Sequence, residues 1–263
     1  MLKFEYFKSQ KKYLVNSPAS KSSKFCIHIK KLPEHLTNII DLPKITLPVL
    51  VDLRNRMPPI YNQGQLGSCT ANALCGGLGY INPKLVGSRL FLYYNERMIE
   101  GNTKNDTGAY IHDGVASLIQ NGICPEVEWP YNVNNFAVKP PVKCYDDALL
   151  HKVFNSYNLN NDIVSMKTCL NLGYPFTVGI MIYNTFDTYT VSKTGMVPMP
   201  TPQDKLLGGH AVLCVGYNDI KQVFIMRNSW GSSWGDKGYF YLPYAYLTST
   251  TLTSDLWCIK MMQ

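Results

Sequence analysis

The residue pattern of the chain changes near residue 162, and no repeat or low-complexity linker marks the change. Before this point apolar residues follow helical spacing, which predicts helices at residues 69–80, 88–99 and 108–120. After it, short apolar runs predict strands at residues 175–183, 210–217, 223–228, 238–242 and 256–261. The sequence therefore predicts an α+β protein, with a mainly helical first half and a sheet or barrel in the second.

A glycine-rich turn that leads into the first predicted helix carries a cysteine, Cys69. From Gln63 the run reads Gln-Gly-Gln-Leu-Gly-Ser-Cys-Thr-Ala-Asn-Ala, a polar turn followed by small helix-forming residues. Free N–H groups and the positive end of the helix dipole favour a thiolate in the first helical turn, and a thiolate is a nucleophile. The side-chain amide of Gln63 can fold back beside the Cys69 N–H and donate to an oxyanion.

Two later segments supply a base and a side chain that orients it. His210 follows two glycines at the start of a predicted buried strand, and Asn228 ends the next strand, before a Trp-Gly-rich loop. Asn228 can accept from one imidazole nitrogen and fix the tautomer, so that the other nitrogen faces Cys69. Trp230 can shield this hydrogen bond from water. Together Cys69, His210, Asn228 and Gln63 predict a cysteine hydrolase.

These segments resemble the papain family of cysteine peptidases (clan CA, C1-type) over roughly Leu47 to Met261. The Cys69 run, the run Ser-Arg-Leu-Phe-Leu-Tyr-Tyr at 88–94 and the Gly-Gly-His run ending at His210 resemble a compact branch from bacteria, archaea and large viruses. The resemblance implies a papain-like two-lobe fold with an active-site cleft between a helical lobe, about 47–162, and a β lobe, about 163–263. It also implies endopeptidase action on polypeptides. Substrate contacts are implied for Gly108, Gly209, Ala211 and residues 183–186.

The chain departs from the family pattern at two positions. Leu66 stands where animal and plant members carry a disulfide cysteine, and no cysteine lies near Gly108, where its partner would fall. That bridge is predicted to be absent. Thr70 replaces the tryptophan that usually follows the nucleophile, which changes the packing behind the helix and removes no reacting group.

Other readings of the same residues stay open. A catalytically silent papain-fold binding or scaffold protein, an exopeptidase and an acyltransferase all fit the motifs, because loops set specificity. The remaining histidines carry no flanking motif. Most other cysteines, namely Cys75, Cys124, Cys169, Cys214 and Cys258, lie among apolar neighbours and are expected to be reduced core residues. Cys26 and Cys144 lie in polar stretches and are expected to be exposed thiols.

Several functional classes lack a signal in the sequence. No Cys-x-x-Cys, His-Glu-x-x-His, phosphate-binding glycine loop or calcium loop occurs, so neither a metal nor a cofactor is predicted. No apolar stretch approaches the ~20 residues needed to cross a bilayer, and the first residues lack the apolar core of a secretory signal. We therefore expect a cytoplasmic or intracellular protein, or one packaged in a virion. The oligomeric state is not predictable from these patterns.

The positive charge of the chain lies in its first 46 residues. They contain nine lysines and three acidic residues, whereas the remainder contains 16 basic and 15 acidic residues. Aromatic and apolar residues are spread among these lysines, so nucleic-acid binding is not expected. This extension precedes the predicted peptidase domain at 47–263 and is either a short propeptide that covers the active site of a zymogen or a tail without regulatory effect.

Overall fold

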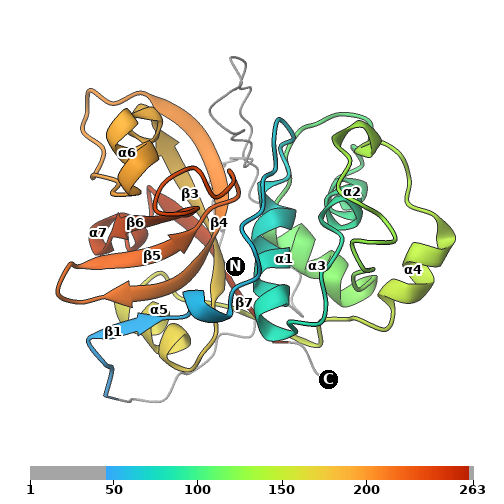
Figure 1. The fold of residues 1–263 in the computed structure, drawn as a ribbon, viewed down its shortest axis with the longest axis horizontal. Helices are drawn as coiled ribbons and strands as arrows, with labels where there is room; N and C mark the ends of the chain where they lie inside the picture. Colours follow the sequence, from blue (N-terminus) through green and yellow to red (C-terminus); the bar gives the residue numbers. More distant parts are fainter. Residues whose placement is uncertain (1–45, 261–263) are drawn as a thin grey trace, which may run out of the picture.

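A computed structural model describes residues 46–260, which form two lobes that meet along helix α1 (Cys69–Ile81) (Figure 1). The N-terminal extension, with Cys26, His28 and His35, and residues 261–263 lie outside the described part. Within residues 46–260 no helix has the length and apolar character that a bilayer crossing requires.

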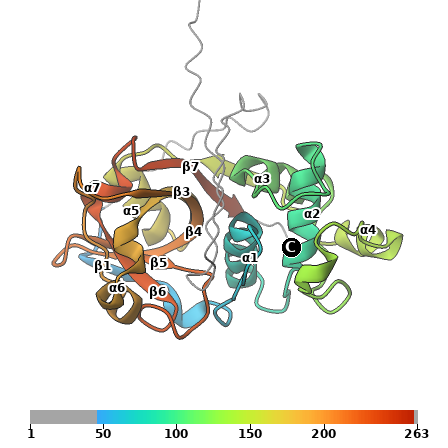
Figure 2. The ribbon, with the colours of Figure 1, turned by 90° about the horizontal axis from the view of Figure 1, so that it is seen from above.

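The first lobe is helical. Its three main helices are α1, α2 (Arg89–Ile99) and α3 (Ile111–Gln120), and the short α4 (Val142–Ala148) lies at its outer end (Figure 2). Helix α2 begins where Ser88 Oγ accepts the Phe91 N–H at 3.1 Å, which satisfies one of the unpaired donors of the first turn. The apolar faces of α1, α2 and α3 share one core, so each helix is held by burial against the other two.

The second lobe is built on an antiparallel sheet with the strand order β2-β7-β3-β4-β5-β6, and β1 pairs with β4 outside this path. The strands are β1 (Leu50–Asp52), β2 (Asn155–Asn158), β3 (Phe176–Tyr183), β4 (Leu206–Asn218), β5 (Val223–Arg227), β6 (Tyr239–Pro243) and β7 (Thr253–Lys260). Short helices complete the lobe, namely α5 (Ile163–Asn171), α6 (Tyr189–Thr194) and α7 (Tyr244–Leu247). Short 3-10 helices lie at η2 (Arg54–Arg56) and η4 (Asn184–Asp187), and a third, η3 (Val133–Asn135), lies between α3 and α4 of the helical lobe.

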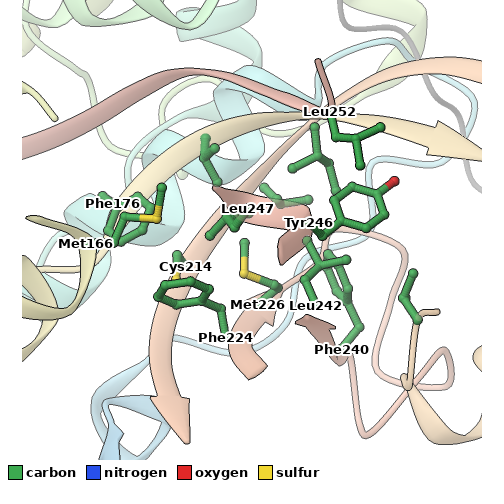
Figure 3. Packing of buried hydrophobic residues seen from close by; sticks show 14 of the residues in the cluster. Met166, Phe176, Cys214, Phe224, Met226, Phe240, Leu242, Tyr246, Leu247 and Leu252 are labelled. Carbon is green, nitrogen blue, oxygen red and sulfur yellow. The ribbon is translucent and has the colours of Figure 1, made fainter. Parts of the chain in front are cut away.

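The core of the sheet lobe lies between the sheet and the short helices. Phe176 of β3, Phe224 of β5 and Phe240 of β6 are fully buried there, and Met166 of α5 and Tyr246 of α7 pack on the same cluster (Figure 3). Large side chains of this kind contribute about 1.5–3 kcal/mol each when they are buried. This core fixes the strands that carry the predicted base.

Helix α1 packs closely against strand β4 because two helical glycines face the strand. A Cβ atom on Gly76 would lie 3.6 Å from the Leu213 side chain, and one on Gly77 would lie 3.5 Å from it. The contact is tight enough that Ala211 of β4 and Trp257 of β7 belong to the core of the helical lobe. The two lobes are therefore joined by a packed apolar seam, and Cys69 and His210 lie on its two sides.

The α+β, two-lobe prediction is confirmed, and so are the three main helices and the five predicted strands, with shifted ends. The largest shift is at β4, which begins at Leu206 because Gly208 and Gly209 pair with Ile182 and Met181 of β3. The sequence pattern missed β1, β2 and the short helices. Residues 132–144, for which the pattern indicated no helix, include η3 and the start of α4.

Candidate active site

The predicted nucleophile, Cys69, is the first residue of α1, as expected from the glycine-rich turn before it. Its Sγ atom accepts a hydrogen bond from the Ala211 N–H at 3.5 Å. Because Ala211 follows His210 in β4, this contact places the cysteine beside the histidine-bearing strand. Both Cys69 and His210 are fully buried, with 0% of their surface exposed.

The surroundings of Cys69 favour the neutral thiol in this conformation. Burial raises the pKa of Cys69 to about 12, because a thiolate would lose its hydration, and the nearby Glu96 carboxyl acts in the same direction. The N–H groups of Ala211 and of the helix start lower the pKa, but by less. In this conformation burial therefore outweighs the effect of the helix start, which was expected to favour the thiolate.

His210 and Asn228 form the predicted hydrogen bond. His210 Nε2 lies 2.8 Å from Asn228 Oδ1, and this same oxygen accepts the Ser229 N–H at 2.8 Å. Because Oδ1 acts as an acceptor for a backbone N–H, the imidazole has to donate from Nε2. The lone pair of the neutral ring is then on Nδ1, which has no hydrogen-bond partner within residues 46–260. His210 is thus held in the tautomer that can take a proton at Nδ1.

Tryptophan side chains cover the imidazole. The Trp230 ring stacks on His210 with 5.0 Å between ring centroids, and Trp234 packs edge-on against Trp230. Asn228 follows β5 directly, where its N–H donates to Gly238 O at 3.0 Å. The Trp-Gly-rich loop therefore packs its two tryptophan rings over the buried His210 side chain.

Burial also controls the charge of His210. The loss of hydration lowers the pKa of the imidazole to about 4, although the hydrogen bond to Asn228 opposes this shift. The folded protein therefore holds His210 neutral at pH values at which an unfolded chain, with an ordinary pKa near 6.5, binds a proton.

This difference predicts a loss of stability in mild acid. A depressed histidine pKa stabilises the fold fully above the unfolded pKa, and the contribution disappears as the pH falls from about 6.5 to about 4. Over this window we expect the free energy of unfolding to fall by about 3 kcal/mol more in the wild type than in a His210→Gln variant, which cannot titrate. Urea unfolding at several pH values measures the free energy of unfolding of both proteins. If the two proteins lose stability in parallel as the pH falls, the prediction is wrong.

Gln63 is fully buried and held from three sides. Its Nε2 donates to Leu66 O at 3.0 Å, its Oε1 accepts from the Ser229 hydroxyl at 2.6 Å, and its own N–H donates to Ser229 O at 2.9 Å. Ser229 follows Asn228 in the chain, so these bonds tie the predicted oxyanion residue to the predicted base-orienting residue across the two lobes.

Several residues that support the site carry no signal in the sequence. The Tyr131 hydroxyl donates to Gln63 O at 3.0 Å and contacts the hydroxyl of Ser68, the residue before the nucleophile. The Thr70 hydroxyl donates to the buried Glu96 carboxyl at 2.7 Å, directly behind Cys69. Burial raises the pKa of Glu96 well above its usual range. Thr70 thus has a polar partner where the family pattern suggested only altered packing.

The residues predicted to contact substrate lie around the same seam. Gly108 is buried at φ +68°, its N–H donates to the Tyr93 hydroxyl at 3.2 Å, and its carbonyl accepts from the Thr107 hydroxyl at 3.4 Å. Gly209 pairs with Met181 in the sheet, and Ala211 N–H is directed at Cys69 Sγ. Residues 183–186 run from the end of β3 into η4. Their contacts with a substrate stay a prediction.

The comparison with protein families agrees with this geometry. The model of the papain family cysteine protease matches residues 47–255. The chain belongs to the papain family of cysteine peptidases. Membership in this family implies polypeptide substrates.

Proteins similar to this peptidase occur in viruses and bacteria. An uncharacterized peptidase C1-like protein of Acanthamoeba polyphaga mimivirus is 37% identical over 91% of this chain and 79% of its own length. The crystal structure of xylellain, a cysteine protease from Xylella fastidiosa, superposes with a TM-score of 0.83 at 36% identity, covering 98% of the peptidase and 100% of xylellain. A viral cathepsin of Cydia pomonella granulosis virus is 26% identical over 86% of this chain and 68% of its own length.

Proposed function

We propose that the peptidase hydrolyses peptide bonds with Cys69 as nucleophile, His210 as acid and base, and Asn228 as the residue that orients His210. The observation that supports this most directly is the double acceptor role of Asn228 Oδ1, toward His210 Nε2 and the Ser229 N–H. This leaves Nδ1 as the only basic nitrogen of the His210 ring. The residue after His210, Ala211, contacts Cys69 Sγ, so the ring and the sulfur lie on neighbouring parts of the site. A thiol beside an imidazole in a defined tautomer is the arrangement that thiol nucleophiles require.

The reaction begins with transfer of the Cys69 thiol proton to His210 Nδ1. In the closed site burial disfavours each charge alone, but transfer creates both charges together, and their attraction offsets part of that cost. The thiolate attacks the scissile carbonyl carbon, and the carbonyl π electrons move to the oxygen. His210 then returns the proton to the leaving amine, and the C–N bond breaks to leave an acyl-enzyme.

Water completes the cycle. His210, neutral again, takes a proton from the water as it attacks the thioester carbonyl. The C–S bond then breaks to release the acid product, and His210 returns the proton to the Cys69 sulfur. In both tetrahedral intermediates the oxyanion receives hydrogen bonds from the Cys69 N–H, at the start of α1, and from the Gln63 side-chain amide. The bonds that Gln63 makes to Leu66 and Ser229 fix the orientation of this amide before substrate arrives.

Full burial of Cys69 and His210 also supports a latent form of the peptidase. A substrate carbonyl cannot reach a sulfur with no exposed surface, so the site has to open before it can react. We propose that the basic segment 1–46 holds the site closed and acts as a short propeptide. Its length and its mixture of lysine with aromatic and apolar residues suit packing on the enzyme surface.

An active-site label tests the nucleophile. We expect an epoxysuccinyl thiol-protease inhibitor to modify a version beginning at Leu47 once, at Cys69, with peptide mapping by mass spectrometry as the readout. The other described cysteines are buried free thiols, whereas Cys69 contacts the residue that follows His210. A His210→Ala variant of the same version is the control and should react far more slowly. A folded protein that takes up no label would instead support a silent scaffold.

Removal of the N-terminal segment tests latency separately. We expect the version beginning at Leu47 to cleave a fluorogenic peptide more than tenfold faster than the full-length protein. This ratio corresponds to at least ~1.4 kcal/mol by which the N-terminal segment favours the closed site over the open one. Adding the peptide of residues 1–46 in trans should restore inhibition. Equal rates from two folded proteins would reject the inhibitory role and leave the catalytic proposal intact.

A further inference from the structure

Two cysteines and a glutamate converge at one point of the helical lobe, away from Cys69. Cys124 Sγ, Cys144 Sγ and a carboxylate oxygen of Glu128 all lie within 4.8 Å of one another. Cys124 and Glu128 come from the loop after α3, and Cys144 comes from α4. Both cysteines are buried free thiols, so Cys144 is not the exposed thiol that its polar neighbours in the sequence suggested.

The carboxylate is only half satisfied. Glu128 Oε1 pairs with Lys143 Nζ at 3.1 Å, whereas Oε2 is buried and has no hydrogen-bond partner within residues 46–260. A buried carboxylate oxygen without a donor destabilises the folded protein, because it has lost its hydration and gained no hydrogen bond. The neighbouring sulfurs offer little compensation, since a thiol is a weak donor and Cys144 Sγ already lies 3.9 Å from Glu128 O. A cation bound at this point would remove the deficit.

We propose that Cys124, Cys144 and Glu128 bind one divalent metal ion of the zinc type, with water as a fourth ligand. Two sulfurs and one carboxylate oxygen suit this class of ion, whose bonds are about 2.3 Å to sulfur and about 2.0–2.2 Å to oxygen. Tetrahedral ligands at such bond lengths lie about 3.6–3.8 Å apart, so the cluster, whose atoms lie within 4.8 Å of one another, needs to contract by about 1.2 Å at most. Binding releases one proton from each thiol, because the metal ligands are thiolates.

The surroundings favour a cation over a disulfide between the same cysteines. A disulfide between the two sulfurs would leave Glu128 Oε2 and its negative charge without a partner. The same negative charge attracts a cation and becomes a ligand to it. The sheet lobe holds another buried pair, Cys169 and Cys258, whose thiols interact with one another, and no carboxylate joins that pair within the described chain.

The metal would close the loop that supports the nucleophile. Between Cys124 and Cys144 the chain contains Trp129, whose carbonyl accepts the Ser88 hydroxyl at 2.6 Å, and Tyr131, which contacts Ser68 and Gln63. A metal that ties the two ends of this loop together would restrain Tyr131 and so stabilise the turn before Cys69. The site therefore has a structural role, and it does not depend on the proposed reaction.

Cobalt binding tests the site in full-length protein with Cys69→Ala and Cys26→Ala, which remove the thiol beside the His210 strand and the thiol two residues before His28. After reduction and treatment with a chelator, we expect one equivalent of Co²⁺ to produce a thiolate-to-cobalt charge-transfer absorption, and Zn²⁺ to displace it. Affinity should fall about 100-fold for each pH unit below neutrality, because two protons are released. Cys144→Ser should weaken binding by at least about 100-fold, and Glu128→Gln by at least about tenfold.

Cys258→Ser is the matched control, because it removes one member of the buried thiol pair that lacks a carboxylate, and it should leave Co²⁺ affinity unchanged. Glu128→Gln keeps the side-chain shape, so its loss of affinity separates ligation from misfolding if Cys144→Ser proves unstable. The proposal is overturned if the reduced, folded protein shows no charge-transfer absorption at stoichiometric Co²⁺. It is equally overturned if the control weakens binding as much as Cys144→Ser does.

Discussion

Replacement of Cys69 by alanine is expected to abolish peptide hydrolysis, with kcat reduced by about 10⁶-fold in the version that begins at Leu47. The size follows from the role proposed for the sulfur, since losing the nucleophile removes the acyl-enzyme route, and nucleophile knockouts in a comparable protease triad cost about this much. Because the fold is held by two apolar cores and the seam between them, a one-atom truncation at the seam should leave it intact. Steady-state rates on a fluorogenic peptide give the measurement.

Cys75→Ala is the matched control for this variant. Cys75 lies on the same helix, is equally buried and undergoes the same chemical change, but it has no counterpart of the Ala211 contact that Cys69 makes. It should lose some stability and retain nearly all activity. Substantial hydrolysis by a pure Cys69→Ala protein would show that another group attacks the substrate, and the assignment of the nucleophile would be wrong.

Local sequence was sufficient to predict the side chains at the centre of the site. Each sits in a segment whose glycine, small-residue or tryptophan pattern has a local structural cause, such as the polar turn before Cys69 or the strand that ends at Asn228. The hydrogen bond between His210 and Asn228 followed from their chemistry together with the strand and loop segments that carry them. The order of helical and β patterns was likewise enough to predict the two lobes.

The residues that support the site through hydrogen bonds could not be predicted in this way, because they are far apart in sequence and no recognisable motif surrounds them. Nothing around Tyr131 indicates that its hydroxyl reaches Gln63 and Ser68. A glutamate on a helix is usually exposed, and only the packing of three helices buries Glu96 behind Thr70. The β2 sequence Asn-Ser-Tyr-Asn has no strand pattern and is a strand only because β7 pairs with it.

Electrostatics were the least predictable part of the site. The start of a helix lowers a thiol pKa, and Cys69 is at such a start, but its complete burial outweighs that effect. The degree of burial depends on how the two lobes close, which no local pattern records. The same limit applies to Cys144, whose polar neighbours suggested exposure, whereas the fold places it inside the helical lobe beside Cys124.

Gln63→Ala is expected to lower kcat by about 10²- to 10³-fold while KM changes little. The amide of Gln63 is proposed to donate to an oxygen that carries full negative charge only in the tetrahedral intermediate, so its loss raises the barrier by about 2.7–4 kcal/mol without weakening ground-state binding. Gln63→Glu should lose at least as much, because an ionised carboxylate accepts hydrogen bonds and repels an oxyanion. Kinetics on a fluorogenic peptide, with kcat and KM determined separately, distinguish these effects.

Ser229→Ala separates this electrostatic role from a structural one. Gln63 Oε1 accepts the Ser229 hydroxyl at 2.6 Å, so this variant removes the bond that orients the amide and keeps the amide itself. We expect a loss of about 1 kcal/mol in the free energy of unfolding and a decrease in kcat much smaller than that of Gln63→Ala. If both variants lower kcat equally, or if Gln63→Ala acts mainly through KM, then Gln63 orders the seam between the lobes and the oxyanion depends on the backbone N–H of Cys69 alone.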